Sequence, residues 1–168
     1  MKSKSLECIS LLLWGLAAVA NAQPPTILLA RHAERADSSS GSSPAMTKDP
    51  DLSAAGVARA ESLGKMLKDA GIKAIFVTEY KRTQQTAAPL AKAAGIAITI
   101  VPAKETDALI AKLRSATGNA LVIGHSNTLP EIIKALGVVE SVTIADSDYD
   151  NLFVVMSGSS PQLIHLHY

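Results

Sequence analysis

Two histidines that follow predicted strands are the strongest candidates for chemistry in this sequence. His32 comes directly after Arg31 and the apolar segment 26–30, and His125 follows the apolar segment 119–123. Ligands of open α/β sheets bind at the carboxyl ends of the strands, so two histidines in matching positions are expected to share one site. A guanidinium suits the geometry of a phosphate group, and a neutral imidazole can attack phosphorus. The pattern therefore predicts phosphoryl chemistry.

A further arginine follows the predicted strand 73–78. Arg82 falls in the first turn of a predicted helix, where the helix dipole disfavours a positive charge. A requirement of the site would explain this placement, and an ordinary surface arginine is the alternative. Gly124 would allow close backbone approach next to His125, and a helix that begins with a capping box at Thr128 would offer N–H donors to an anion.

The elements that must position these residues alternate along the chain. Strands are predicted over residues 26–30, 73–78, 96–101, 119–123, 152–156 and 162–166, and helices over residues 53–70, 81–94, 106–117 and 128–136. Ser53 is expected to cap the first helix, and Pro89 is expected to kink the second helix or to begin a new turn within it. Residues 36–50 are predicted to form a loop. The alternation predicts an α/β fold of three layers, α/β/α, around a mainly parallel sheet with an antiparallel edge.

Four segments resemble signatures of the histidine phosphatase superfamily, also called phosphoglycerate mutase-like. Arg-His-Ala-Glu at residues 31–34 is similar to its Arg-His-Gly-Glu signature, and Leu-Ser-Ala-Ala-Gly at residues 52–56 resembles its helix start. Residues 78–87 resemble a family segment in which an arginine is followed, after two residues, by Gln-Thr-Ala. Gly-His at residues 124–125 resembles the segment of the family's second histidine. The segments occur in the family's order, so the resemblance implies a phosphoglycerate mutase-like domain.

The resemblance also implies a role for each matching residue. His32 matches the nucleophile that forms a phosphohistidine intermediate, and Arg31, Arg82 and His125 match the rest of the phosphate pocket. No metal and no other cofactor are implied, because these cations neutralise the phosphoryl group.

Several positions depart from the family's branches. Ala33 stands where glycine is usual, and Asp37 and Ser126 replace the proline and aspartate of the acid phosphatase branch. The likeness is closer to the compact phosphatases, including the phosphohistidine phosphatase type. Arg35 and Asn127 are predicted to contact the substrate.

The proton donor for the leaving group is less clearly marked than the phosphate pocket. Some branches of the family supply a glutamate after the third strand, and Glu105 lies in that region. Glu79 is a second candidate, and the absence of any carboxylate donor is a third possibility, since a phosphohistidine substrate has a better leaving group.

Residues 1–22 have the layout of a cleavable signal peptide. Lys2 and Lys4 precede an apolar run over residues 9–20, and Ala-Asn-Ala at residues 20–22 fits the cleavage pattern, with the cut after Ala22. The apolar run is too short for a stable membrane anchor, so export to the periplasm or the medium is expected. Cleavage leaves residues 23–168 as a single domain without its one cysteine, Cys8.

Composition narrows the class of partner. The 168 residues carry a formal net charge of +1, which gives no reason to expect nucleic acid, and a single cysteine excludes a disulfide framework. The sequence therefore predicts an exported phosphatase that hydrolyses a small phosphorylated substrate. A phosphohistidine phosphatase acting on a protein and a non-catalytic binder of phosphorylated ligands are the alternatives.

Overall fold

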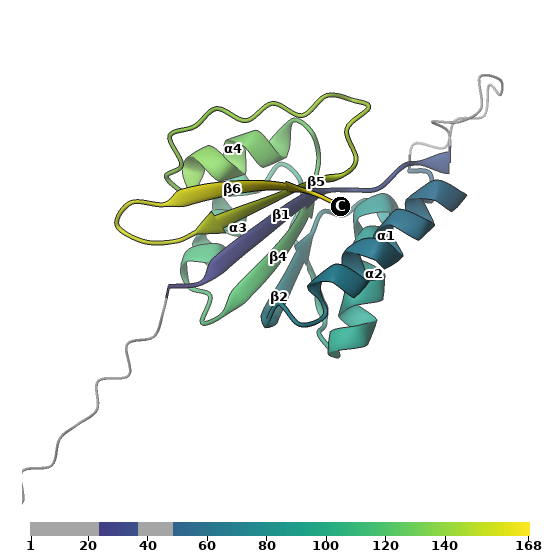
Figure 1. The fold of residues 1–168 in the computed structure, drawn as a ribbon, viewed down its shortest axis with the longest axis horizontal. Coiled ribbons are helices and arrows are strands. Elements are labelled where there is room, and N and C mark those ends of the chain that lie inside the picture. Colours follow the sequence, from purple (N-terminus) through teal and green to yellow (C-terminus); the bar gives the residue numbers. More distant parts are fainter. Residues whose placement is uncertain (1–23, 37–48) are drawn as a thin grey trace, which may run out of the picture.

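The computed structural model describes residues 24–36 and 49–168, so the predicted signal peptide and most of the predicted loop at 36–50 lie outside the described residues. The strands are β1 (Thr26–Arg31), β2 (Ile72–Val77), β3 (Ile98–Ile100), β4 (Asn119–Gly124), β5 (Asn151–Met156) and β6 (Gln162–His167). The helices are α1 (Ala54–Leu67), α2 (Lys81–Ala94), α3 (Thr106–Arg114) and α4 (Thr128–Ala135) (Figure 1).

The strands form one sheet with the order β3-β2-β4-β1-β5-β6. The pairs β2–β3, β2–β4 and β1–β4 are parallel, and β1–β5 and β5–β6 are antiparallel. The predicted mainly parallel sheet with an antiparallel edge is therefore confirmed. Because β1 and β4 are neighbours, the carboxyl ends of the two strands that precede the histidines lie side by side.

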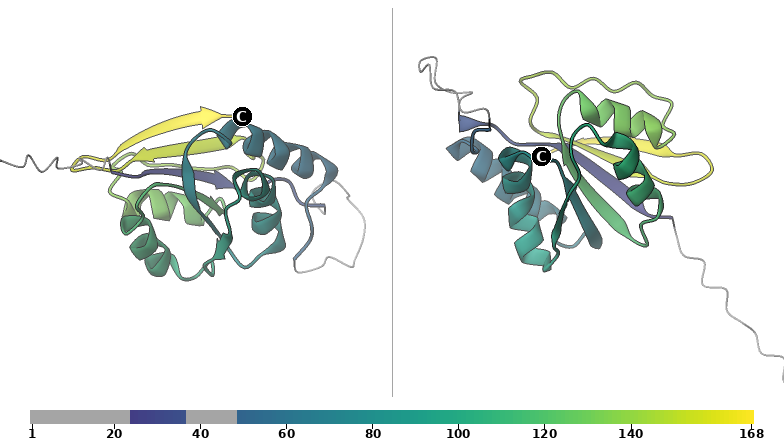
Figure 2. Two further views of the ribbon diagram at one scale, coloured as in Figure 1. Left: turned by 90° about the horizontal axis from the view of Figure 1, so that it is seen from below. Right: turned by 180° about the vertical axis from the view of Figure 1, so that it is seen from behind.

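The helices cover the two faces of this sheet in pairs, α1 with α2 and α3 with α4, as the predicted three layers require (Figure 2). Side chains that alternate along β4 enter separate cores: Val122 packs with α3 and α4, and Leu121 and Ile123 pack with α1 and α2. Burial on both faces explains why the parallel strands are continuous apolar runs in the sequence.

Helix α1 begins as predicted and ends earlier than predicted. The side chain of Ser53 accepts a hydrogen bond from the N–H of Gly56 at 3.1 Å, which confirms the cap. The helix ends at Leu67, three residues before the predicted end, because the N–H of Ala70 bonds to the carbonyl of Leu67 in a closing turn at 3.0 Å.

Of the predictions for α2 and α4, the one for α2 is confirmed and the capping box of α4 is wrong. Helix α2 runs from Lys81 to Ala94 as predicted and includes Pro89. The capping box at Thr128 is wrong, because α4 has Asn127 at its N-cap position without a side-chain cap. The hydroxyl of Thr128 instead accepts a hydrogen bond from the N–H of His125 at 3.2 Å.

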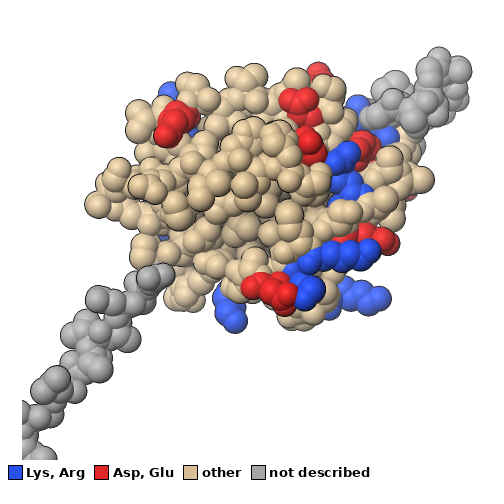
Figure 3. Space-filling view, in the orientation of Figure 1, with Lys and Arg blue, Asp and Glu red and all other residues tan. Residues whose placement is uncertain are grey.

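The edge of the sheet formed by β5 and β6 is less covered than the rest. Met156, Ile164 and Leu166 are exposed large apolar side chains on these two strands. In Figure 3 the surface over this part of the molecule is largely uncharged, and most charged side chains gather toward α1 and α2.

Gly56 makes the closest approach between α1 and the segment after β1. A Cβ built on Gly56 would lie 2.2 Å from the carbonyl oxygen of Glu34, which is backbone and has little room to move. The contact keeps α1 against the segment that carries His32, so the size of residue 56 affects both stability and the site.

Replacing Gly56 by alanine is therefore expected to lower the free energy of unfolding by about 1–3 kcal/mol, the usual cost of overpacking. Urea unfolding measures the difference. Gly158→Ala is the matched control, because a Cβ there meets no atom within 4 Å, and it should change stability by less than about 0.5 kcal/mol. Equal stability of the two variants would contradict the packing described for Gly56.

Candidate active site

The two predicted histidines meet at the carboxyl ends of β1 and β4. The last residues of these strands, Arg31 and Gly124, are register partners, and His32 and His125 follow them. The N–H of His32 bonds to the carbonyl of Gly124 at 3.0 Å. The two imidazole centroids are 5.3 Å apart, and both residues are buried. The sheet topology thus brings together two side chains that are 93 positions apart in the sequence.

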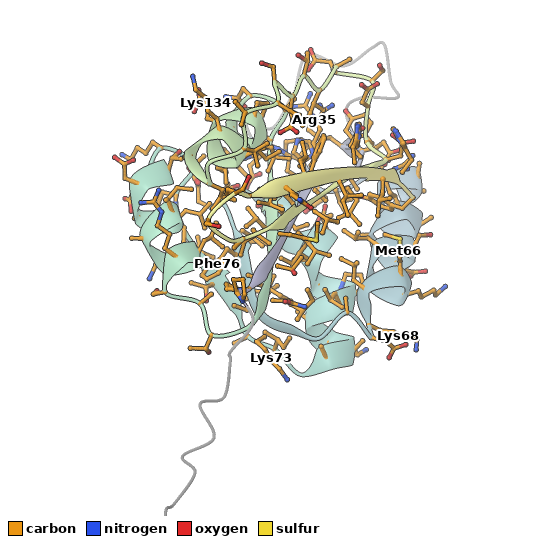
Figure 4. All side chains as sticks on the ribbon, turned by 60° about the vertical axis from the view of Figure 1, so that its left-hand side comes forward. Arg35, Met66, Lys68, Lys73, Phe76 and Lys134 are labelled. Atoms are coloured by element: carbon orange, nitrogen blue, oxygen red, sulfur yellow. The ribbon has the colours of Figure 1, made fainter. Side chains whose placement is uncertain are left out.

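A cavity of about 650 Å³ lies over this pair. It is lined by Arg31, His32, Arg35, Tyr80, Arg82, Ala103, His125, Ser126, Asn127, Thr128, Asp146, Ser147 and Tyr149. Six of the seven predicted site residues are among them, and Glu105 is not. Figure 4 shows Arg35 at this end of the sheet and Lys73 at the opposite end.

The ring of His32 is held in one orientation by the backbone carbonyl of the next residue, Ala33. Its Nδ1 atom lies 2.8 Å from the carbonyl oxygen of Ala33. A carbonyl oxygen only accepts hydrogen bonds, so Nδ1 carries the proton of the neutral ring and Nε2 keeps its lone pair. The ring is therefore prepared to act as a nucleophile through Nε2.

Burial keeps this ring neutral. The pKa of His32 is lowered from 6.5 to about 3, chiefly by removal from water. The hydrogen bond to the Ala33 carbonyl opposes the shift, and nearby His125, Arg82 and Arg31 contribute to it. Burial, followed by Arg82, likewise lowers the pKa of His125 to about 4. Both rings are neutral at pH 7 in the unliganded protein, so the formal charge of the cavity comes from its arginines and one aspartate.

His125 is fixed by two threonines. Its Nε2 atom lies 3.0 Å from the hydroxyl of Thr78, which lies 3.0 Å from the hydroxyl of Thr83. The Thr83 hydroxyl donates to the carbonyl of Tyr80 at 2.7 Å, so it accepts from Thr78. The oxygen of Thr78 is then left to accept from Nε2 of His125. Thr78, the first residue of the segment 78–87, thus helps to orient the ring of His125.

Arg31 joins the catalytic strand to the segment before β5. Its Nη1 atom donates to the carbonyls of Ala145, Asp146 and Asp148 at 2.9, 3.0 and 3.2 Å. Its guanidinium carbon lies 4.2 Å from the ring centroid of Tyr149, within the range of a cation–π contact.

Arg82 has partners that explain a cation in the first turn of α2. The carboxylate of Asp49 accepts a hydrogen bond from the N–H of Lys81, and Oδ1 of Asp49 lies 3.6 Å from Nη1 of Arg82. A negative charge at the helix start offsets the unfavourable dipole interaction. The guanidinium carbon of Arg82 lies 4.2 Å from the ring centroid of Tyr80.

The two tyrosines were not predicted from the sequence. Tyr80 contacts Arg82 and also lies edge-on to His125, with ring centroids 5.3 Å apart. Tyr149 contacts Arg31 and lies 6.2 Å from His32 by the same measure. Each aromatic ring therefore touches one arginine and one histidine, and the pair forms two walls of the cavity.

Two further residues of the family-like segments, Thr86 and Glu34, hold neighbouring parts of the site together. The hydroxyl of Thr86 accepts from the N–H of Ala33 at 2.9 Å and donates to the carbonyl of Arg82 at 2.6 Å, so it links the two halves of the site. Glu34 forms a two-pronged ion pair with Arg59 of α1 at 2.7–3.0 Å, which gives this motif glutamate a structural partner.

Neither glutamate predicted as a proton donor lines the cavity. Glu105 lines a second, smaller cavity next to α3, which has apolar walls such as Phe76 and shares Ala103 and Thr128 with the larger cavity. The carboxylate of Glu79 accepts a hydrogen bond from the N–H of Ala103 at 2.8 Å. The structure thus does not bring Glu105 to the two histidines.

No group of three or more His, Cys, Asp or Glu side chains within residues 24–36 and 49–168 is arranged to hold a metal ion. The arrangement that the described residues do provide consists of two neutral imidazoles and several guanidinium groups around one polar cavity. Such a set can bind a phosphoryl group and accept it on nitrogen.

Comparison with known proteins agrees with this geometry. Residues 27–108 match the model of the histidine phosphatase superfamily, branch 1. The match includes the segments of His32 and Arg82. No curated protein sequence matches the chain.

Solved structures share the fold at low sequence identity. The protein histidine phosphatase SixA, complexed with tungstate, is 15% identical with a TM-score of 0.66, over 84% of this chain and 96% of the other. The alpha-ribazole phosphatase from Shigella flexneri is 16% identical with a TM-score of 0.66, over 85% and 96%. The mycobacterial glucosyl-3-phosphoglycerate phosphatase is 12% identical with a TM-score of 0.65, over 86% and 98%. In each case the match covers nearly all of the solved chain.

The lowered pKa values of the two histidines predict a loss of stability in mild acid. In the unfolded chain their pKa is about 6.5, so protonation favours unfolding once the pH falls below that value, and the loss continues until the folded pKa is reached. From pH 7 to pH 5 each histidine is expected to cost roughly 2 kcal/mol of unfolding free energy.

Urea unfolding of the unliganded protein at the two pH values measures this loss. His32→Gln cannot take up the proton and should lose roughly 2 kcal/mol less than the wild type over the same interval. An identical loss in the variant would show that His32 is not buried as a neutral ring.

Proposed function

The chain belongs to the histidine phosphatase superfamily, and on that premise we propose that it is an exported phosphatase that hydrolyses small phosphomonoesters through a phosphohistidine intermediate on His32. The observation that carries the proposal is the ring of His32, which is buried, neutral and held with its Nε2 lone pair free by the Ala33 carbonyl.

The first step is attack of Nε2 of His32 on phosphorus. A bond forms between that nitrogen and phosphorus as the bond from phosphorus to the ester oxygen breaks. Arg82 and His125 are placed to stabilise the negative charge on the other phosphoryl oxygens, and Arg31 adds its charge beside the nucleophile. Binding a dianion would also favour the protonated form of His125, which then becomes a better donor when the cavity is filled.

The second step is attack of water on the phosphohistidine. The bond between phosphorus and nitrogen breaks, its electron pair returns to Nε2 of His32, and inorganic phosphate leaves. Because the carbonyl of Ala33 holds the Nδ1 proton in both steps, the ring does not have to reorient between them.

A phosphohistidine protein is a second candidate substrate. Neither Glu79 nor Glu105 lines the cavity, and a phosphorylated imidazole leaves more easily than an alkoxide. The similar fold of the protein histidine phosphatase SixA makes this substrate worth testing alongside the small esters.

The kinetic test uses p-nitrophenyl phosphate with sugar, nucleotide and phosphohistidine substrates. His32→Ala is expected to abolish turnover of every substrate that the wild type hydrolyses, and Arg82→Ala to lower kcat by roughly 10²- to 10³-fold, as for a lost oxyanion donor. Lys65→Ala is the control, because that side chain is exposed on α1 and does not line the cavity.

Turnover that persists in His32→Ala would overturn the mechanism. A wild-type protein that binds phosphate but turns over none of these substrates would instead favour the non-catalytic binder.

Export rests on the sequence of residues 1–22, outside the described residues. No helix that the structure describes is long and apolar enough to cross a membrane. Cell fractionation with sequencing of the mature N-terminus tests the proposal, and the expected first residue is Gln23. Cytoplasmic protein that retains Met1 would contradict it.

A further inference from the structure

The hydrogen bonds around His125 determine which of its two nitrogens carries the proton. The single hydroxyl hydrogen of Thr83 is directed at the carbonyl oxygens of Thr78 and Tyr80, at 3.0 and 2.7 Å. The Thr83 oxygen therefore accepts from the hydroxyl of Thr78, and the Thr78 oxygen accepts from Nε2 of His125, each at 3.0 Å. In the neutral ring Nε2 carries the proton, and Nδ1 carries the lone pair.

Nδ1 of His125 is open to the cavity. Within residues 24–36 and 49–168 no protein group forms a hydrogen bond with this atom, whereas Nε2 of the same ring is bonded to Thr78. Nδ1 is also not among the described polar atoms that are buried without a partner, so it is accessible from the cavity that His125 lines. The ring centroids of His125 and His32 are 5.3 Å apart. A phosphoryl group that His32 attacks is therefore next to a nitrogen that only accepts hydrogen bonds.

This lone pair restricts the ionic form of the ligand. The oxygens of a fully ionised phosphoryl group also only accept hydrogen bonds, so they repel an unprotonated nitrogen unless a proton lies between them. A phosphate monoester has a second pKa of about 6, so both its monoanion and its dianion are accessible near neutral pH. The monoanion has one P–O–H group, which can donate to Nδ1 of His125 while the other oxygens face the arginines.

The surroundings of His125 keep the lone pair on Nδ1 until a ligand binds. The titratable and charged groups near the ring lie at the end of β1, between β2 and α2, and in the first turn of α2: Arg31, His32, Glu79, Tyr80 and Arg82. Burial, followed by Arg82, lowers the pKa of His125 to about 4, and Arg31 also lowers it, whereas Glu79 opposes the shift. The free ring is therefore neutral near pH 7, and the proton enters the site with the phosphoryl group.

We propose that Nδ1 of His125 selects a phosphoryl group that carries one proton, so that the site binds phosphomonoesters as monoanions and discriminates phosphate from sulfate. The proposal rests on the function proposed above, because it assigns the ionic form of the substrate at that same site. Thr78 and Thr83 are positioning residues here, since they act by fixing the proton of His125 on Nε2. Sulfate has the charge and shape of the phosphate dianion but takes up no proton near neutral pH, so it cannot donate to Nδ1.

Calorimetry with inorganic phosphate measures this proton directly. At pH 8 free phosphate is mostly the dianion, and titrations in buffers of different ionisation enthalpy give the number of protons taken up on binding. The wild type is expected to take up about one proton for each phosphate bound. Sulfate should bind roughly 10- to 100-fold more weakly under the same conditions, the usual effect of one hydrogen bond that involves a charged group.

Two variants locate the effect at His125. In Thr78→Val the acceptor for Nε2 is lost, so the ring proton moves to Nδ1 and the neutral ring can donate to a dianion. Proton uptake should then fall below about half a proton, and the affinities for phosphate and sulfate should agree within about threefold. His125→Gln should have the same two effects, because its amide N–H can donate to a dianion. Thr99→Val is the matched control, since Thr99 is exposed on β3 outside the cavity and the variant should keep the wild-type values.

The tautomer of His125 gives a second readout that does not depend on the folding of Thr78→Val. A long-range proton–nitrogen NMR spectrum of the unliganded wild type at pH 7 should show His125 protonated at Nε2 and unprotonated at Nδ1. His32→Gln should retain the proton uptake of the wild type, because the acceptor is on the other ring.

Phosphate binding by the wild type without proton uptake, or a neutral His125 protonated at Nδ1, would overturn the proposal and leave the proposed function in place. Proton uptake that is lost in His32→Gln and kept in His125→Gln would overturn it in favour of His32 as the acceptor. Proton-linked binding in a protein without turnover would keep this assignment and overturn the phosphatase function. A wild-type protein that binds no phosphate would overturn both together.

Discussion

The hydrogen bond from Nδ1 of His32 to the carbonyl of Ala33 is the interaction on which the chemistry of this site depends. It sets the tautomer of the ring and leaves the lone pair on Nε2, the atom that attacks phosphorus in the proposed mechanism. The same residue is held on its other side, since the N–H of Ala33 donates to the hydroxyl of Thr86. That hydroxyl donates in turn to the carbonyl of Arg82, so the orientation of the nucleophile and the placement of the phosphate-binding arginine are linked through one threonine.

Burial of the two histidines is the second constraint, and it affects both their protonation and the stability of the protein. It keeps both rings neutral, which a nucleophile requires, and it costs stability when the pH falls. A bound phosphoryl dianion would offset the positive field of Arg31 and Arg82. The unliganded cavity therefore favours the neutral form of His32, which is the reactive form in the proposed mechanism.

Much of this architecture follows from sequence periodicity. The apolar segments that precede His32 and His125 are the neighbouring strands β1 and β4, because strands buried on both faces have a continuous apolar sequence. The position of Arg82 in the first turn of α2 conflicts with the helix dipole, and the structure places this residue in the lining of the cavity. The resolution of this conflict by Asp49 required the folded chain, since residue 49 lies more than 30 positions away from the helix start.

Other parts of the site depend on contacts that no local pattern contains. Tyr149 meets Arg31, and Tyr80 meets His125, only in the folded chain. The capping-box pattern at Thr128 was misleading because its hydroxyl binds the backbone of His125 instead. Glu105 was chosen by its order after the third strand, but that segment leads its side chain to a different cavity.

The protonation of His32 tests the central claim most directly. A long-range proton–nitrogen NMR spectrum of the ¹⁵N-labelled unliganded protein at pH 7, with His32→Gln to assign the ring, reports the state of both nitrogens. The predicted result is a neutral ring protonated at Nδ1 and unprotonated at Nε2, unchanged until the pH approaches 4. A proton on Nε2, or a ring protonated at both nitrogens at pH 7, would contradict the assignment of His32 as the nucleophile through Nε2.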